Sequence, residues 1–538
     1  MSSATIGAAT SAQAETATVS RREMRRVVLG SALGTVFEWY DFFLYGTLAA
    51  FFGPLFFSPA LGETGAFLAS LATYGAGLVL RPFGSLLFGK MGDTVGRKVT
   101  FLVTMALMGV STAGVGLLPT FAAAGVLAPA LLVSLRMLQG LAMGGEYGGA
   151  ATYVAEHAAP GRRGAATGWI QICASGGFFL SLVAVFATRG LIGSEAFKVW
   201  GWRVPFLVSV VLLGVSMFVR ARLHESPVFR AMKAEGRASR APVGEAYGQH
   251  RWRNLMLLSL FGCVAGVGVV WYAGQFYALF FLTKVLKVDP NLAQGMLAVA
   301  LALATPFFVL SGALSDRLGR KRVIMGGLVV AALAYFPLFH ALTHYANPAL
   351  ERATVAAPVV VRADGCATHF FSGPVTPCDR VREQLNVAGV AHALEPGGGA
   401  EPLVRVGNTE VRGADPAALA AALRTAGYPA AANPAEVNRV AVTAILFMLV
   451  LFVCVTYGPM AAYLVELFPA RIRYTALSMP YHLGTGYVGG FMLYFATLIA
   501  TSTGNIYGGL WYTVLIALGS ALLGLWRLPE TRGCDIRQ

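Results

Sequence analysis

The chain has 538 residues, of which 56% are hydrophobic and only 12% are charged. A soluble globular protein carries about twice that share of charged residues, and an outer-membrane barrel shows an alternating pattern that this sequence lacks. The net charge of +15 does not indicate a nucleic-acid-binding protein, because the basic residues lie in short segments between apolar runs. The composition therefore indicates a helical membrane protein with many spans.

A polar tail precedes twelve apolar runs. Residues 1–20 are rich in Ser, Ala and Thr and contain no apolar core, so we expect a disordered tail and not a signal peptide. Each run is about 20 residues or longer, which is enough to cross roughly 30 Å of hydrocarbon. We predict membrane-spanning helices near residues 27–57, 66–89, 99–118, 125–152, 164–190, 202–222, 254–283, 293–314, 323–345, 439–465, 474–500 and 508–527.

The first run contains GTVFEWYDFFLYG (34–46), in which two carboxylates interrupt an apolar helix. Glu38 lies about 17 Å into the span, and Asp41 and Tyr45 follow on the same helical face. A charged acid at this depth costs roughly 2.5–3.5 kcal/mol, so it should face a cavity, a cation or a proton. We interpret Glu38 and Asp41 as proton-binding candidates. The alternative is a structural ion pair or an interhelical hydrogen bond.

The segment after the second run, GKMGDTVGRK (89–98), recurs as GALSDRLGRK (312–321) after the eighth. Six spans therefore repeat as six more, the layout of two transporter halves around a midplane site. Asp93 with Arg97, and Asp316 with Arg320, can bond the ends of neighbouring helices and lock one conformation. The alternative is ordinary basic-loop chemistry. Between the tenth and eleventh runs, Glu466 and Arg473 are predicted to form another gate pair on the cytoplasmic side.

The distribution of basic residues predicts which loops lie on the cytoplasmic side of the membrane. The loops that carry the repeated motif are rich in Lys and Arg, whereas 58–65 and 119–124 contain neither, so the former are predicted to be cytoplasmic, together with both termini. The predicted organisation is a cytoplasmic tail (1–20), an N-terminal bundle (21–222), a cytoplasmic linker (223–253), a C-terminal bundle in two parts (254–345 and 439–527) with an insertion (346–438), and a second cytoplasmic tail (528–538).

Polar and aromatic residues in four further runs are candidates for a solute site. RMLQGLAMGGEYGGA (136–150) places Arg136, Gln139, Glu146 and Tyr147 within roughly a 100° arc of one helix. Its glycines allow another helix to approach closely. This face suits an anionic or zwitterionic solute or a proton gate, whereas the alternative is a bridge from Arg136 to Glu38 or Asp41 that only fixes packing. Further candidates are Tyr45, Trp271, Tyr272, Gln275, Tyr457 and Tyr481 for the solute, with His482 as a proton relay, although such aromatic residues are more often packing anchors.

The insertion, residues 346–438, is polar and too long for a simple connection. APVVVRADG and PLVRVGNTEVRG predict strands, whereas CDRVREQLNVAG and DPAALAAALRTAGYP predict helices, the second with Asp415 as its N-cap. We therefore expect a small α+β domain outside the cytoplasm. Cys366 and Cys378 are predicted to form a disulfide there. A metal site that uses His369 and His392 is the alternative, although the spacing matches no zinc pattern well.

Several of these stretches together resemble a known family. The paired GKMGDTVGRK and GALSDRLGRK loops resemble the signature of the major facilitator superfamily. The stretches GTVFEWYDFFLYG, RMLQGLAMGGEYGGA, GWRVPFL, RLHESPVF and YLVELFPARIRYTALSMPYHLGTG are similar to its metabolite:proton symporter branch. The resemblance covers about 27–527 apart from the insertion, which typical members lack. It implies that Glu38, Asp41, Arg136 and Glu146 handle solute and protons.

The resemblance implies proton-coupled uptake of a small carboxylate or zwitterion across a bacterial inner membrane by alternating access. We expect a monomer that acts on a solute and protons, with no nucleic acid, cofactor or bound metal. Because no GxxxxGK[ST] loop and no catalytic constellation is found, ATP-driven transport and enzymatic activity are not predicted. The alternatives are a uniporter or efflux antiporter on the same scaffold, and a membrane sensor that uses the insertion.

Overall fold

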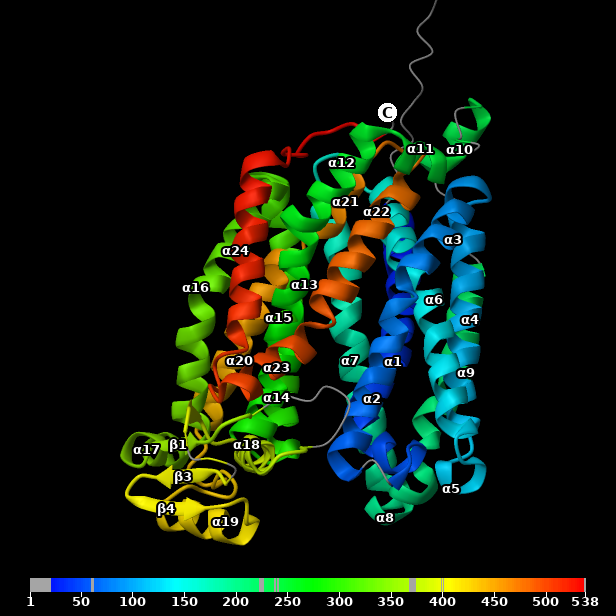
Figure 1. The fold of residues 1–538 in the computed structure, drawn as a ribbon. Coiled ribbons are helices and arrows are strands. Elements are labelled where there is room, and N and C mark those ends of the chain that lie inside the picture. Colours follow the sequence, from blue (N-terminus) through cyan, green and yellow to red (C-terminus); the bar gives the residue numbers. More distant parts are fainter. Residues whose placement is uncertain are drawn as a thin grey trace, which may run out of the picture.

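The protein is described by a computed structural model that covers residues 21–59, 62–221, 227–236, 239, 241–366, 374–397, 399 and 401–536. The tail predicted for 1–20 and the predicted alternative metal ligand His369 lie outside the described residues. Within the described part, nine helices are long and apolar enough to cross a membrane. The molecule is thus a bundle of long apolar helices with a small sheet at one end (Figure 1).

The first six apolar runs form the N-terminal half of the bundle. The second run is divided at Leu80, because Pro82 has no N–H to continue the helical hydrogen bonds. This break places Arg81 at the start of a new helix. The long helices of this half are α1 (Arg21–Phe56), α2 (Gly62–Val79), α3 (Arg81–Thr94), α4 (Arg97–Leu117), α6 (Leu127–His157), α7 (Arg163–Ile192) and α9 (Arg203–Ala221), with short elements α5 (Phe121–Ala124), α8 (Ser194–Ala196) and η2 (Phe197–Gly201) between them.

The remaining apolar runs form the C-terminal half, in which two long helices are interrupted by π-helical segments. Such segments widen a helix locally and are frequent at functional sites. The seventh run consists of α12 (His250–Ser259), η3 (Leu260–Val264), α13 (Ala265–Tyr272), η4 (Ala273–Tyr277), α14 (Ala278–Phe280) and η5 (Phe281–Val285). The other helices are α15 (Pro290–Leu318), α16 (Arg320–Ala346), α20 (Arg439–Tyr457), α21 (Met460–Leu467), α22 (Arg473–Tyr481), η6 (His482–Gly489), α23 (Met492–Thr503) and α24 (Leu510–Arg527).

Glycines let α6 pack directly against the backbone of α2 and α3. A Cβ atom added at Gly140 would lie 1.7 Å from the carbonyl oxygen of Gly77, and one at Gly144 would lie 2.3 Å from that of Arg81. Real Cβ atoms do not approach backbone this closely, so these positions require glycine. The close packing holds the polar face of α6 against the break between α2 and α3.

The bundle has two distinct ends (Figure 1). One end carries the repeated segments 89–98 and 312–321, and we call it the motif end. The linker helices α10 (Pro227–Ala234) and α11 (Pro242–Gly248) lie there. The opposite end carries the sheet, and we call it the insertion end.

The insertion folds around a four-stranded sheet with the order β2-β1-β3-β4, in which β1 and β2 are parallel and the other neighbours antiparallel. Thr376 forms a capping box at the start of the helix after β1, and Asp415 caps the last helix, as predicted. Cys366 and Cys378 form the predicted disulfide. The elements are α17 (Pro348–Ala356), β1 (Val359–Arg362), α18 (Pro377–Ala388), β2 (His392–Glu395), β3 (Leu403–Val406), β4 (Thr409–Arg412) and α19 (Pro416–Thr425).

The insertion is hydrogen-bonded to the C-terminal half. Arg382 of α18 donates to the carbonyl oxygens of Thr501 and Ser502, both at 3.2 Å, in the last turn of α23. The backbone N–H of His392 donates to the carbonyl oxygen of Gly504, directly after α23, at 3.0 Å. Lys287, just after η5, donates to a carbonyl of α18 and accepts from Ala432. The insertion therefore connects the C-terminal end of α23 with the loop after η5, and both belong to the same half of the bundle.

Acidification is expected to weaken this contact through His392. Burial and the nearby Arg382 guanidinium lower the pKa of His392 below its ordinary value of 6.5, so the folded protein favours the neutral imidazole. The associated stability is present above about pH 6.5 and is lost as the pH falls through the lowered pKa. The melting temperature should thus fall more between pH 7.5 and 5.5 in the wild type than in His392→Gln. Equal falls in the two proteins would contradict this prediction.

Candidate functional site

The acids of α1 and α6 lie inside the bundle. Glu38 and Asp41 are only 4% and 5% exposed, and Glu146 is buried as well. The hydroxyl of Thr35, one turn before Glu38, donates to Oε1 of Glu146 at 3.1 Å. Glu146 therefore lies beside the turn of α1 that precedes Glu38. Asp41, one turn further along α1, instead lies near Thr112 of α4 and Ser209 of α9.

A chain of polar side chains connects Arg136 to Asp41. Arg136 donates to Oε1 of Gln139, whose Nε2 donates to the hydroxyl of Thr112 at 2.7 Å. Asp41 lies close to the hydroxyls of Thr112 and Ser209, and the Thr112 hydroxyl itself donates to the carbonyl of Met108 at 3.0 Å. Two predicted solute residues are thus linked to a predicted proton carrier through Thr112, which the sequence analysis did not identify.

Arg136 forms no ion pair in the described part of the chain, so the predicted alternative of a packing bridge to Glu38 or Asp41 is wrong. Its guanidinium carbon instead lies 4.4 Å from the ring centre of Tyr45, and 5.0 Å from that of Phe42. The ring of Tyr45 is oriented by its hydroxyl, which donates to the carbonyl of Ser70 at 3.0 Å. Aromatic faces compensate part of the buried charge.

Three predicted tyrosines meet where the two halves touch. The rings of Tyr147 and Tyr481 stack with 3.4 Å between their centres, and the hydroxyls of Tyr457 and Tyr481 lie 2.8 Å apart. Gln171 of α7 donates to the hydroxyl of Tyr147 at 3.0 Å and to the carbonyl of Tyr457 at 2.6 Å. Gln171 therefore joins the halves, although no sequence pattern singled it out.

The remaining solute candidates come from the seventh apolar run. Trp271 stacks on Phe43 with 5.6 Å between ring centres, and Tyr272 packs against Trp271 at 4.9 Å. Gln275 lies in η4 and is fully buried, and neither polar atom of its amide has a partner in the described part of the chain. The predicted relay His482 is buried beside Tyr481, at the start of η6.

The two repeated segments make equivalent contacts across the motif end. Asp93 pairs with Arg97 at 3.0 Å, and it also accepts hydrogen bonds from the backbone N–H and hydroxyl of Thr475, in the first turn of α22. Asp316 pairs with Arg320 at 2.7 Å and accepts from the N–H groups of residues 164 and 165, in the first turn of α7. Each aspartate therefore binds the N-terminus of a helix in the opposite half.

The predicted pair between Glu466 and Arg473 is not formed. Arg473 binds Glu156 at 2.9 Å, whereas Glu466 binds Arg320 at 3.3 Å and Arg163 at 3.6 Å. Glu156 and Arg163 stand seven residues apart, as do Glu466 and Arg473. The acid of each half therefore pairs with the arginine of the other half. The repeated spacing of seven residues was the signal in the sequence that could have identified Glu156 and Arg163.

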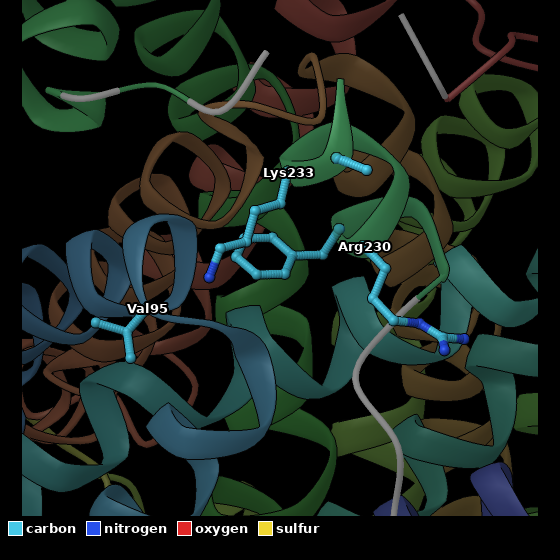
Figure 2. Close-up of a pocket in the computed structure, with 5 residues that line it drawn as sticks. Val95, Arg230 and Lys233 are labelled. Carbon is cyan, nitrogen blue, oxygen red and sulfur yellow. The ribbon is translucent and has the colours of Figure 1, made fainter. Parts of the chain in front are cut away.

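The linker covers the motif end beside these pairs. Phe229 of α10 lies under the guanidinium of Arg97, with its ring centre 4.8 Å from the guanidinium carbon. Figure 2 shows the adjacent hollow of about 380 Å³, lined by Val95, Phe229, Arg230, Lys233 and Ala234. Its lining contains no acid, and we assign it no role in solute binding.

Known transporters are similar to this chain in sequence or in fold. Residues 32–350 match the profile of the Major Facilitator Superfamily, and residues 416–538 match that of "Sugar (and other) transporter". The chain is 38% identical to the shikimate transporter of Escherichia coli over 334 residues, which are 60% of this chain and 74% of that protein. It is 33% identical to the proline/betaine transporter of Salmonella typhimurium over 323 residues, which are 58% of this chain and 64% of that protein.

The fold is similar to that of the proton:xylose symporter XylE bound to 6-bromo-6-deoxy-D-glucose. The TM-score is 0.63 at 15% identity, and the match covers 96% of this chain and 98% of the symporter. A partially occluded inward-open structure of XylE from E. coli gives a TM-score of 0.59, with 95% and 99% covered. At this identity, the similarity shows a common fold.

Proposed function

The chain belongs to the Major Facilitator Superfamily and is a transporter embedded in the inner membrane, not an enzyme, and we propose that it takes up a small carboxylate or zwitterion together with protons. The observation that carries this proposal is the polar chain from Arg136 through Gln139 and Thr112 to Asp41. A solute that binds Arg136 would disturb the environment of a proton-binding carboxylate, and this is what coupling requires.

The proposed transport cycle uses twelve spans in two halves. A proton binds Asp41 or Glu38, with Glu146 as a third acceptor in the same region. Solute is proposed to bind between the halves, in contact with Arg136, Tyr147, Gln275 and the other solute candidates. The halves then rock about this site and release both inside. The proposed site residues are Tyr45, Arg136, Gln139, Tyr147, Trp271, Tyr272, Gln275, Tyr457 and Tyr481.

The motif end is proposed to be the cytoplasmic gate. Asp93, Arg97, Asp316 and Arg320 close it, together with the exchanged pairs of Glu466 and Arg473. These contacts all join or brace the two halves, so their formation supports a conformation in which solute does not reach the cytoplasm. With this orientation, both termini are cytoplasmic, the insertion is periplasmic, and the protein acts as a monomer.

Reconstitution tests the proposal. Purified protein is placed in liposomes that contain a pH-sensitive dye, and small carboxylates and zwitterions are added outside. Solute-dependent acidification of the lumen is expected. Uptake of a radiolabelled solute without acidification would instead indicate a uniporter, and lumen alkalinisation on uptake would indicate exchange against protons. A sensor that uses the insertion would show neither uptake nor acidification.

A further inference from the structure

Two buried arginines in the bundle lack an acidic partner. Among the described residues, five arginines are fully buried, and three of them, Arg97, Arg320 and Arg473, form ion pairs. Arg81 and Arg136 form none, although they are only 1% and 0% exposed. An unpaired buried charge is costly, so two such charges in one region call for a counter-ion that the protein itself does not provide.

The two guanidinium groups share an aromatic platform. Their central carbons lie 4.5 Å (Arg81) and 5.0 Å (Arg136) from the ring centre of Phe42, and their charges repel each other. Arg81 also lies 5.8 Å from the ring of Trp39, and Arg136 lies 5.4 Å from that of Tyr74. The faces of these rings are therefore already occupied by cations of the protein. A quaternary ammonium group would find no free face here and would meet two positive charges.

The edges of the guanidinium groups, in contrast, retain free donors. Nε of Arg81, and Nε and Nη2 of Arg136, have no hydrogen-bond acceptor in the described part of the chain. The contact of Arg81 with the sulfur of Met143 involves a different nitrogen. Ring faces stabilise a guanidinium from above its plane and do not use its N–H groups. These donors match the two oxygens of a carboxylate.

Arg81 also lies at the boundary between the halves. Its Cδ would be 3.6 Å from a Cβ atom added at Gly486, in η6 of the C-terminal half. From the same half, Nε1 of Trp271 and both amide atoms of Gln275 lack partners, and the Trp271 ring lies 6.2 Å from that of Trp39. Neutral donors and acceptors thus lie across the boundary from two cations. They suit the hydroxyl or carbonyl groups of the same solute.

We infer that the solute is a carboxylate anion with hydroxyl or carbonyl groups, bound through Arg81 and Arg136, and that Arg81 selects it against betaine-like solutes. This inference rests on the proposed function and narrows its solute class. When Glu38, Asp41 and Glu146 are protonated, the two arginine charges remain uncompensated. Proton loading therefore prepares the site for an anion, and the anion in turn favours the protonated acids.

Purified full-length protein in liposomes with an internal pH dye tests this inference. The probes are shikimate and 2-oxoglutarate as carboxylate anions, and glycine betaine and proline as zwitterions. We expect acidification with at least one of the carboxylates and none with the zwitterions. Arg81→Gln should lower kcat/KM for the carboxylate roughly 10- to 100-fold, because charge-assisted hydrogen bonds are lost. Arg81→Lys, which keeps the charge, should lose less.

Arg189→Gln is the matched control, because Arg189 also lies over two rings, Phe51 and Phe197, but away from the centre. It should transport normally, and an unchanged melting temperature of Arg81→Gln would show that this variant is folded. Acidification by betaine or proline, with Arg81→Gln as active as wild type, would overturn the inference and leave proton symport intact. Carboxylate uptake without acidification would support the anion site and contradict proton coupling. If no carboxylate is taken up or raises the melting temperature, the anion site is wrong.

Discussion

Asp41→Asn is expected to abolish concentrative uptake. The amide has nearly the shape of the carboxyl group, but it cannot bind or release a proton at physiological pH. Solute movement should therefore no longer be tied to the proton gradient. With the membrane potential clamped, each pH unit of gradient supports about a tenfold accumulation by a one-proton symporter. Under an imposed gradient of two units, wild-type liposomes should accumulate solute roughly 100-fold, whereas Asp41→Asn should reach only equal concentrations.

The measurement must separate loss of coupling from loss of folding. Exchange of labelled for unlabelled solute at equal pH on both sides needs no net proton movement, and Asp41→Asn should retain it. Glu38→Gln is the companion variant, because Glu38 lies on the same helix and is equally buried. Glu195→Gln, an exposed acid in α8 that pairs with Lys198, should behave as wild type. Normal accumulation in both Asp41→Asn and Glu38→Gln would remove these acids from the coupling mechanism.

Gly140→Ala is expected to lower the stability of the protein strongly, because the added methyl group would meet backbone atoms of α2. The new Cβ atom would lie 1.7 Å from the carbonyl oxygen of Gly77, so α2 and α6 would have to separate. Overpacking of this kind typically costs about 1–3 kcal/mol. The displacement would also move Gln139 and Arg136, which precede Gly140 on α6. Both the melting temperature in detergent and the transport rate should therefore fall.

Gly214→Ala in α9 is the matched control. It is also a helical glycine, but a Cβ atom there would contact nothing within 4 Å. Alanine is the better helix former by about 0.8–1.0 kcal/mol in peptides, so this variant should be as stable as wild type or more stable. If Gly140→Ala melted at the same temperature as Gly214→Ala, the close approach of α2 and α6 would not be important for stability.

Long apolar runs and local turn signals predicted much of the architecture. The run 164–190 became α7 (Arg163–Ile192), and 508–527 became α24 (Leu510–Arg527), because hydropathy reports directly on the burial of helices in lipid. In the insertion, the stretches APVVVRADG and PLVRVGNTEVRG predicted β1 and the strands β3 and β4, and Asp415 correctly marked the start of α19. The short strand β2 and helix α17 were not predicted, since neither has a strong periodic pattern.

Contacts between the halves were harder to predict. The predicted pair Glu466–Arg473 joined two residues that are close in the sequence, at the end of α21 and the start of α22. In the structure, Arg473 instead pairs with Glu156, and Glu466 pairs with Arg163. These pairs depend on how the two halves face each other, which spacing in the sequence does not show. Arg81 lies inside the predicted run 66–89 but was overlooked, because it belongs to none of the motifs that were identified in the sequence. Only the break at Pro82 and the packing of α6 show that it is buried in the centre.

The attachment of the insertion has a practical consequence for imaging. A transporter that lies almost entirely within a lipid or detergent belt offers few features by which single particles can be aligned in electron microscopy. Here a disulfide-linked sheet projects from one half and is fixed to it through Arg382, His392 and Lys287. Because it is tied to the end of α23 and to the loop after η5, both in the same half, it should report the orientation of that half in each image. The chain thus carries its own fiducial marker.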